Sequence, residues 1–174
     1  MTGKTFWKLV ANGETDVIGI FLAIVQQAGS AYCVIGGLGV NAYAEPVVSL
    51  DLDVVVVSDR IPAIRAGAEA NGMRVEEFEH RLNLSMPGSD VRIQLHTDSR
   101  YQNFLKRSAQ RNVLGYSLSV ASLQDVLRGK VWAYSDAERR KSKRQKDLSD
   151  IIRLVDAHPE LRTQLPPEIV SQLD

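Results

Sequence analysis

The chain has 174 residues, which is enough for one domain with a sizeable core or for one domain with a small second lobe. Apolar residues make up 44% and charged residues 24%, so a disordered or fibrous chain is excluded. The net charge is zero, but residues 1–98 carry 12 acidic and 7 basic side chains, whereas residues 99–174 carry 9 acidic and 14 basic ones. Such a distribution lets the two parts attract each other, or lets them bind a cation and an anion in a shared cleft.

Membrane and secretory features are missing from the sequence. No apolar stretch approaches the ~20 residues of a membrane-spanning helix, and the N-terminus lacks the apolar core of a signal peptide. The single cysteine, Cys33, excludes an internal disulfide framework and is expected to be a buried small side chain. His80, His96 and His158 show no metal-ligand spacing. We therefore expect a cytoplasmic protein with no membrane partner.

Helices and short apolar strands alternate in the first half of the chain. Apolar residues at helical spacing before Gly29 predict a first helix, and a β-branched run that starts at Leu52 predicts a central strand. The elements predicted for this half are helices at 16–29, 39–44 and 60–71 and strands at 32–35 and 52–57.

Strands and then helices follow in the second half. The tetrapeptide 87–90, Pro-Gly-Ser-Asp, has turn chemistry, so the flanking strands are expected to form a hairpin. Ser122 is a good N-cap for the next helix. The predicted elements are strands at 73–78, 82–86, 91–96 and 114–120, the last at a sheet edge, and helices at 100–107, 123–135, 139–157 and, briefly, after Pro166 and Pro167.

The order of these elements predicts an α+β fold. We expect a mixed β-sheet flanked by helices, together with a helical C-terminal lobe. Residues 1–120 would form the core, and residues 121–174 would form the lobe packed on it, as a single compact unit.

Two aspartates, Asp51 and Asp53, stand one residue apart about a dozen residues after Gly36 and Gly37. Residues i and i+2 of a strand point to the same face, so both carboxylates project together. Unpartnered, they would repel each other, and one would tend to keep its proton. Mg²⁺ removes this conflict because it takes one or two carboxylates, waters and substrate phosphates as ligands. The pattern indicates a metal-assisted phosphoryl or nucleotidyl transfer site, and solvated aspartates after an ordinary turn are the structural alternative.

Residues 31–57 resemble the core motif of the nucleotidyltransferase superfamily, above all the branch related to abortive-infection (AbiEii-like) toxins and minimal nucleotidyltransferases. The residues that carry the resemblance are Gly36-Gly37, Ala42, Tyr43, Glu45-Pro46, Ser49 and Asp51-Leu52-Asp53. The resemblance implies that the backbone at Gly36 and Gly37 cradles a triphosphate, with Ser49 nearby, and that Asp51 and Asp53 hold magnesium. Backbone N–H groups freed by glycines suit an anion, which gives the family pattern its physical reason.

The resemblance also implies a third acidic residue on a neighbouring strand, as metal ligand or general base. Gln94 stands at that place, and its amide is neutral and cannot take a proton at neutral pH. Gln94 could still orient a hydroxyl or bind a metal through its carbonyl, so we assign it to the catalytic group and leave the general base open. Asp90 and Asp98 would share its face but lie ~13 Å away along a straight strand. Val47 stands where relatives often place an arginine.

The C-terminal segment resembles the second-lobe motif of the abortive-infection branch. Lys130 and Lys146 match two family lysines that approach the triphosphate, and Asp147 matches the acidic residue after the second. Cations are needed there because charge on the leaving pyrophosphate must be neutralised. Alternatively, Lys146 and Asp150 form a helical i,i+4 pair on a solvated face. The basic run 139–144 could instead meet an RNA acceptor, and Trp132 and Tyr134 are expected to be packing residues.

The sequence thus predicts a Mg²⁺-dependent nucleotidyltransferase that moves a nucleoside monophosphate from an NTP to a hydroxyl. By resemblance, the acceptor is an RNA, a protein or a small molecule. The alternative is a non-catalytic module of the same fold that binds a nucleotide or a partner, and either could belong to a toxin–antitoxin system.

Overall fold

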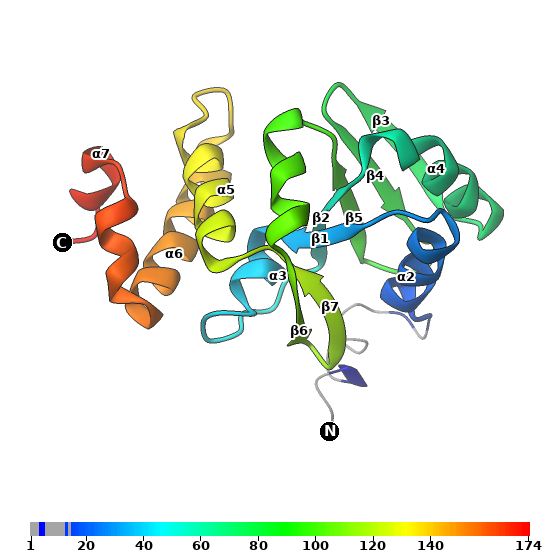
Figure 1. Ribbon diagram of the computed structural model, residues 1–174, viewed down its shortest axis with the longest axis horizontal. Coiled ribbons are helices and arrows are strands. Elements are labelled where there is room, and N and C mark those ends of the chain that lie inside the picture. Colours follow the sequence, from blue (N-terminus) through cyan, green and yellow to red (C-terminus); the bar gives the residue numbers. More distant parts are fainter. Residues whose placement is uncertain (1–3, 6–12, 14) are drawn as a thin grey trace.

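One mixed β-sheet forms the centre of the computed structural model, which describes residues 4, 5, 13 and 15–174. Within these residues the sheet has seven strands in the order β3-β4-β5-β2-β1-β7-β6 (Figure 1). The pairs β2·β5 and β1·β7 are parallel and the other neighbours are antiparallel. The strands are β1 (Tyr32–Ile35), β2 (Asp51–Val56), β3 (Arg74–Phe78), β4 (Arg81–Ser85), β5 (Arg92–His96), β6 (Ala109–Val113) and β7 (Tyr116–Val120).

Helices lie on both sides of the sheet. In the view of Figure 1, α2 and α4 lie to its right and α5, α6 and α7 to its left. The α-helices are α2 (Val17–Gln27), α3 (Gly36–Val40), α4 (Ile61–Ala70), α5 (Leu123–Ser135), α6 (Lys141–Ala157) and α7 (Pro167–Val170). The 3-10 helices are η1 (Ser58–Arg60), η2 (Ser99–Arg107) and η3 (Pro159–Gln164). No described helix is long and apolar enough to cross a membrane.

Side-chain oxygens cap the α-helices α2 and α5 at their N-termini. Asp16 Oδ1 accepts a hydrogen bond from the Gly19 amide at 3.0 Å, at the start of α2. Ser122 Oγ accepts one from the Asp125 amide at 3.2 Å, at the start of α5, as its sequence position predicts. Each cap satisfies an amide that has no partner within the helix.

The two faces of β2 and β5 differ sharply in polarity. Leu52, Val54, Ile93 and Leu95 are at most 1% exposed and belong to one continuous apolar core with residues of α2 and α4. The alternate residues face the other way. Register pairs Asp53 with Gln94 of β5, Gln94 with Asn83 of β4, and Asn83 with Glu76 of β3, so these four side chains form one row across four strands.

The predicted α+β fold is confirmed, with corrections to individual elements. The hairpin of β4 and β5 is present. The short helix predicted over 39–44 instead starts at Gly36, directly after β1. The strand predicted at the edge is β7, which pairs with both β1 and β6, so that prediction of an edge position is wrong. The edge strand β6 was not predicted, and residues 100–107 belong to a 3-10 helix.

The C-terminal helices share the core of the sheet. Leu127 of α5 and Leu148 and Ile151 of α6 are at most 9% exposed and join the same buried cluster as the strands. Cys33 is fully buried in β1. Burial and the nearby charge of Asp125 raise the pKa of its thiol to about 12, which keeps it protonated at neutral pH.

Candidate active site

Asp51 and Asp53 lie on β2 with their side chains on one face of the sheet, and both line a cavity of about 1040 Å³. Gln94 lies directly beside Asp53 on the parallel neighbour β5 and lines the same cavity. The structure therefore brings together the three residues that the sequence assigns to catalysis. Asp98 also lines the cavity, whereas Asp90 does not.

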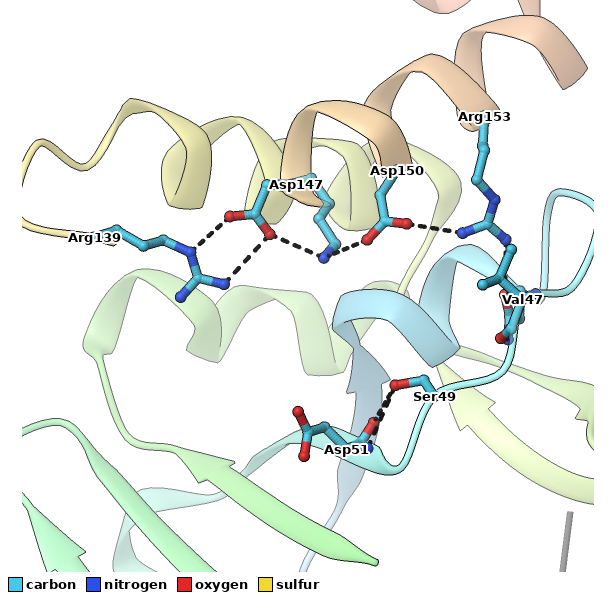
Figure 2. Close-up of polar contacts among 9 residues, drawn as sticks. Val47, Ser49, Asp51, Arg139, Asp147, Asp150 and Arg153 are labelled. Atoms are coloured by element: carbon cyan, nitrogen blue, oxygen red, sulfur yellow. Dashed lines mark hydrogen bonds and ion pairs between the residues drawn. The ribbon is translucent and has the colours of Figure 1, made fainter. Parts of the chain in front are cut away.

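Gly36 packs directly against Asp53. Its φ is +66°, in the left-handed region that favours glycine, and a Cβ added there would lie 2.9 Å from the Cβ of Asp53. At Gly37 an added Cβ would have ordinary contact with Ser49 Oγ, at 3.7 Å. Ser49 Oγ also lies 3.4 Å from the Asp51 amide nitrogen (Figure 2). The two glycines, Ser49 and the two aspartates thus form one compact corner of the cavity.

His96 forms a hydrogen bond with Asp53, a contact that the sequence analysis missed. Its Nε2 lies 2.9 Å from Asp53 Oδ1, and both side chains are about one-fifth exposed. Burial raises the pKa of Asp53, but the hydrogen bond from His96 and the charges of His96, Lys130 and Arg139 outweigh it and hold that pKa below its ordinary value. Asp53 is therefore a carboxylate at neutral pH. One feature of the sequence could have indicated this contact. His96 lies two residues after Gln94, so both side chains point to the same face of the strand.

A chain of alternating charges joins α5 to α6, and three of its members, Lys130, Arg139 and Asp147, line the cavity. Lys130 Nζ of α5 lies 3.1 Å from Asp147 Oδ1 and 2.7 Å from Asp150 Oδ2, both on α6 (Figure 2). Arg139 Nε pairs with Asp147 Oδ2 at 2.6 Å, and Arg153 Nη1 with Asp150 Oδ1 at 2.8 Å. Both aspartates and the lysine are buried, so each charge is satisfied by its neighbours rather than by water.

Arg153 continues this chain to the loop that leads into β2. Its Nη2 donates to Asn41 Oδ1 at 2.8 Å and to the Glu45 carbonyl. The Asn41 side chain also bonds both the amide and the carbonyl of Val47, at 3.0 and 2.8 Å. Arg153 of α6 thus holds the loop at Val47, the position where the resemblance described above implies an arginine.

The two predicted lysines lie in different environments. Lys130 is 7% exposed. Burial lowers its pKa, but the charges of Asp150 and Asp147 raise it above the ordinary value. Lys146 is exposed and lines the cavity, and it forms no ion pair with another described residue. The i,i+4 pair of Lys146 with Asp150 is not formed, because Asp150 pairs with Lys130 and Arg153.

Charged side chains of both signs line the cavity. The sheet contributes Asp51 and Asp53 together with Arg81 and Arg92, and the turn between α5 and α6 and the start of α6 contribute a basic cluster, Arg139, Arg140, Lys143 and Lys146, together with Asp136, Glu138 and Asp147. A cavity of this size can take a nucleotide, and this charge arrangement suits a cation on the sheet side and phosphates on the lobe side. The carboxylates of Asp51 and Asp53 and the basic cluster of the α5–α6 turn therefore share one cavity.

Trp132 lines the cavity, but its ring is already engaged. It stacks on Phe104 with centroids 5.7 Å apart, and the Arg100 guanidinium lies 4.9 Å from its centroid. This arrangement fits the packing role expected from the sequence rather than a platform for a nucleobase.

The donor set around Asp51 and Asp53 fits a magnesium ion that completes its shell from the substrate. The described residues contain no cluster of three or more His, Cys, Asp or Glu side chains able to hold a metal alone. Two carboxylates on one strand face, with the amide of Gln94 alongside, are hard oxygen donors. Mg²⁺ is usually bound by one or two carboxylates together with waters and phosphates, so the residues fit this ion.

Comparisons with known proteins find similar folds among solved structures. Neither a family model nor a curated protein matches the sequence. The crystal structure of ANT(2")-Ia in complex with adenylyl-2"-tobramycin is similar with a TM-score of 0.61 and 17% identity, over 90% of this chain and 92% of that one. The lincomycin-bound lincosamide antibiotic adenylyltransferase LnuA gives 0.55 and 14%, over 81% and 97%. An antigenic nucleotidyltransferase-like protein from Paracoccidioides brasiliensis gives 0.54 and 17%, over 90% and 86%.

The similarity covers nearly the whole length of each of these solved chains. Because the sequence identity is low, it gives information on the fold alone. The relation to the abortive-infection branch stays a prediction. The chain has the mixed α+β fold of the nucleotidyltransferases.

Proposed function

We propose that this protein is a metal-dependent nucleotidyltransferase that moves a nucleoside monophosphate from an NTP to a hydroxyl group. The observation that carries the proposal is the pair Asp51 and Asp53 on one strand face, under the tight turn at Gly36, in a cavity that is also lined by the basic cluster at the start of α6. The fold shared with two antibiotic adenylyltransferases supports it.

In the proposed reaction the acceptor oxygen forms a new bond to the α-phosphorus of the NTP. The bond between the α-phosphorus and the bridging oxygen breaks, and pyrophosphate leaves with that electron pair. The hydroxyl proton leaves to a base other than Gln94, whose amide cannot take it. When bound, a magnesium ion supplies charge stabilisation for the phosphate oxygens.

The protein residues bind and orient the reactants. Asp51 and Asp53 would hold the ion, and His96 fixes the orientation of Asp53 through its hydrogen bond. The backbone at Gly36 and Gly37, with Ser49, would lie against the phosphates. Lys146 is the proposed cation for the leaving pyrophosphate. Lys130 would act through its positive field on Asp53 rather than by contact, because two aspartates already bind its ammonium.

Gln94 and Val47 favour a second candidate, a non-catalytic module of the same fold that binds a nucleotide or a protein partner. Gln94 stands where the family pattern has a carboxylate, and Val47 where it has an arginine. Such a module could be one member of a toxin–antitoxin pair.

Labelling with all four α-³²P NTPs separates the two candidates. The intact protein is incubated with Mg²⁺, each NTP and, in turn, total cell RNA, total cell protein and a hydroxyl-bearing antibiotic. The enzyme transfers label to one acceptor class, and Asp53→Asn reduces the rate at least 100-fold, whereas Asp59→Asn, an exposed aspartate outside the cavity, does not. Nucleotide binding without labelled product for any acceptor would support the module instead.

A further inference from the structure

The polar face of β3, β4 and β5 continues from the aspartate pair toward the β3 edge. Three rows of paired residues cross these strands. The row of Asp53 continues through Gln94, Asn83 and Glu76. The neighbouring rows are Asp51, Arg92, Ser85 and Arg74 on one side, and Val55, His96, Arg81 and Phe78 on the other. Ten of these twelve side chains are polar, so this face is built for a polar ligand rather than for a covering helix.

A second hollow of about 490 Å³ lies over this face. Its lining includes Glu76, Arg81, Asn83, Asp90 and Arg92. Arg81 and Arg92 also line the large cavity, so the second hollow adjoins the aspartate pair. Its volume falls within the range of small-molecule sites.

Two buried polar atoms of this face have no partner among the described residues. Asn83 is only 9% exposed, and its Oδ1 accepts no hydrogen bond. The Nε of Arg81, which lies two residues away on the same face, donates none. Buried polar groups are nearly always paired in native proteins, and an unpaired one costs free energy. One acceptor and one donor without partners indicate a ligand that supplies both a donor and an acceptor.

We propose that this polar face, from Gln94 through Asn83 to Arg81, binds the acceptor of the transfer reaction, and that the acceptor is a hydroxyl-rich small molecule rather than a nucleic acid. The inference rests on the proposed function. Asn83 lies two strands from Asp53, a separation of about 10 Å, so the acceptor spans about the length of a disaccharide. One hydroxyl would reach the α-phosphate while others bind the asparagine and the arginine.

Charge on the second hollow argues against nucleic acid. Two carboxylates, Glu76 and Asp90, stand there against two guanidinium groups, Arg81 and Arg92. Phosphodiesters need an excess of positive charge, which the second hollow lacks. Hydroxyl groups offer both a donor and an acceptor and need no net charge.

The transfer assay with Asn83→Leu tests this inference. The intact protein is given Mg²⁺, labelled NTP and three probes: tobramycin, lincomycin and total tRNA. We expect label on a small probe and none on tRNA. Asn83→Leu should raise the KM of that probe about tenfold, with kcat within twofold and NTP affinity unchanged by calorimetry. Gln110→Leu, an exposed amide on β6 at the far end of the sheet, is the matched control and should leave all three values unchanged.

Arg81→Met is the second variant, for use if Asn83→Leu unfolds, and it should raise the same KM. In ¹⁵N-labelled protein the side-chain amide signal of Asn83 should shift when the small probe binds. Labelling of tRNA alone, an unchanged KM in both variants, or no amide shift with either small probe would overturn the inference and leave the nucleotidyltransferase standing. Failure of the wild-type protein to bind any NTP would instead remove the proposed function.

Discussion

At the scale of single residues, Gly36 links the backbone to the aspartate pair. Adding a side chain at Gly36 would cost free energy in two ways, through the left-handed backbone and through the contact with Asp53. Gly29 allows the two costs to be separated. Gly29 has a similar φ of +63°, but an added Cβ would meet nothing within 4 Å.

We therefore expect Gly29→Ala to lower the free energy of unfolding by about 1–2 kcal/mol, the cost of a left-handed alanine. Gly36→Ala should cost more, by at least ~1 kcal/mol, because Asp53 must also move. Urea unfolding of the two variants measures the difference. Equal losses would mean that the side chain of Asp53 yields without strain.

The aspartate pair could be predicted from the sequence because strand alternation is local. Asp51 and Asp53 need only the geometry of their own strand, and the same holds for Gln94 relative to His96. The bond between His96 and Asp53 depends on the parallel register of β2 and β5, which two distant segments set together. The ion pairs of Lys130 with Asp147 and Asp150 depend likewise on the packing of α5 against α6, so the sequence did not predict them, and the phosphate contact expected for Lys130 stays a prediction.

At the scale of elements, the charge chain joins α5 and α6 to the loop before β2. Lys130 is its centre, because it separates two buried carboxylates that would otherwise repel each other. Lys130→Met should lower the free energy of unfolding by about 3–5 kcal/mol, since both aspartates then lose a partner. Lys141→Met, at the exposed start of α6, should change it by less than ~0.5 kcal/mol.

The pH dependence of this effect has a definite sign. Because the pKa of Lys130 is raised in the folded protein, its contribution is fully present below the ordinary lysine value of 10.5 and is lost as the pH rises through the folded value. The difference between wild type and Lys130→Met should thus be constant from pH 6 to 9 and shrink above about pH 10.5. Chemical denaturation across this range checks the trend, and a difference that already falls below pH 9 would contradict it.

The elements that were predicted least well lack the local sequence patterns on which such predictions depend. β6 has exposed residues at four of its five positions, three of them polar, so no hydrophobic alternation marks it. Its pairing with β7 is driven by the tight turn at Leu114 and Gly115, which have φ values of 53° and 80°. The sequence predicts the start of α3 at residue 39 rather than at Gly36, because glycines have a low helix propensity. In the structure, the packing around Asp53 and the core favours a helix from Gly36 onward.

At the scale of the whole molecule, one core runs from α2 through the sheet to α6. We therefore predict that residues 1–120 and residues 121–174 unfold together. Thermal unfolding followed by far-ultraviolet circular dichroism should give one transition, and the near-ultraviolet signal of the aromatic cluster around Trp132 should coincide with it. Two separated transitions would show that the helical lobe is an independent unit.

Mutations on the two faces of β3, β4 and β5 are expected to have different effects. Substitutions on that face alter the surface above the sheet, while the leucines, isoleucine and valines on the reverse side keep their packing. A single inserted residue in β5 would exchange the two faces, bringing Gln94 and His96 inward and Ile93 and Leu95 outward. Point mutations at the exposed positions of that face can therefore change specificity with little effect on folding, whereas a one-residue change in strand length would abolish the site and the core together.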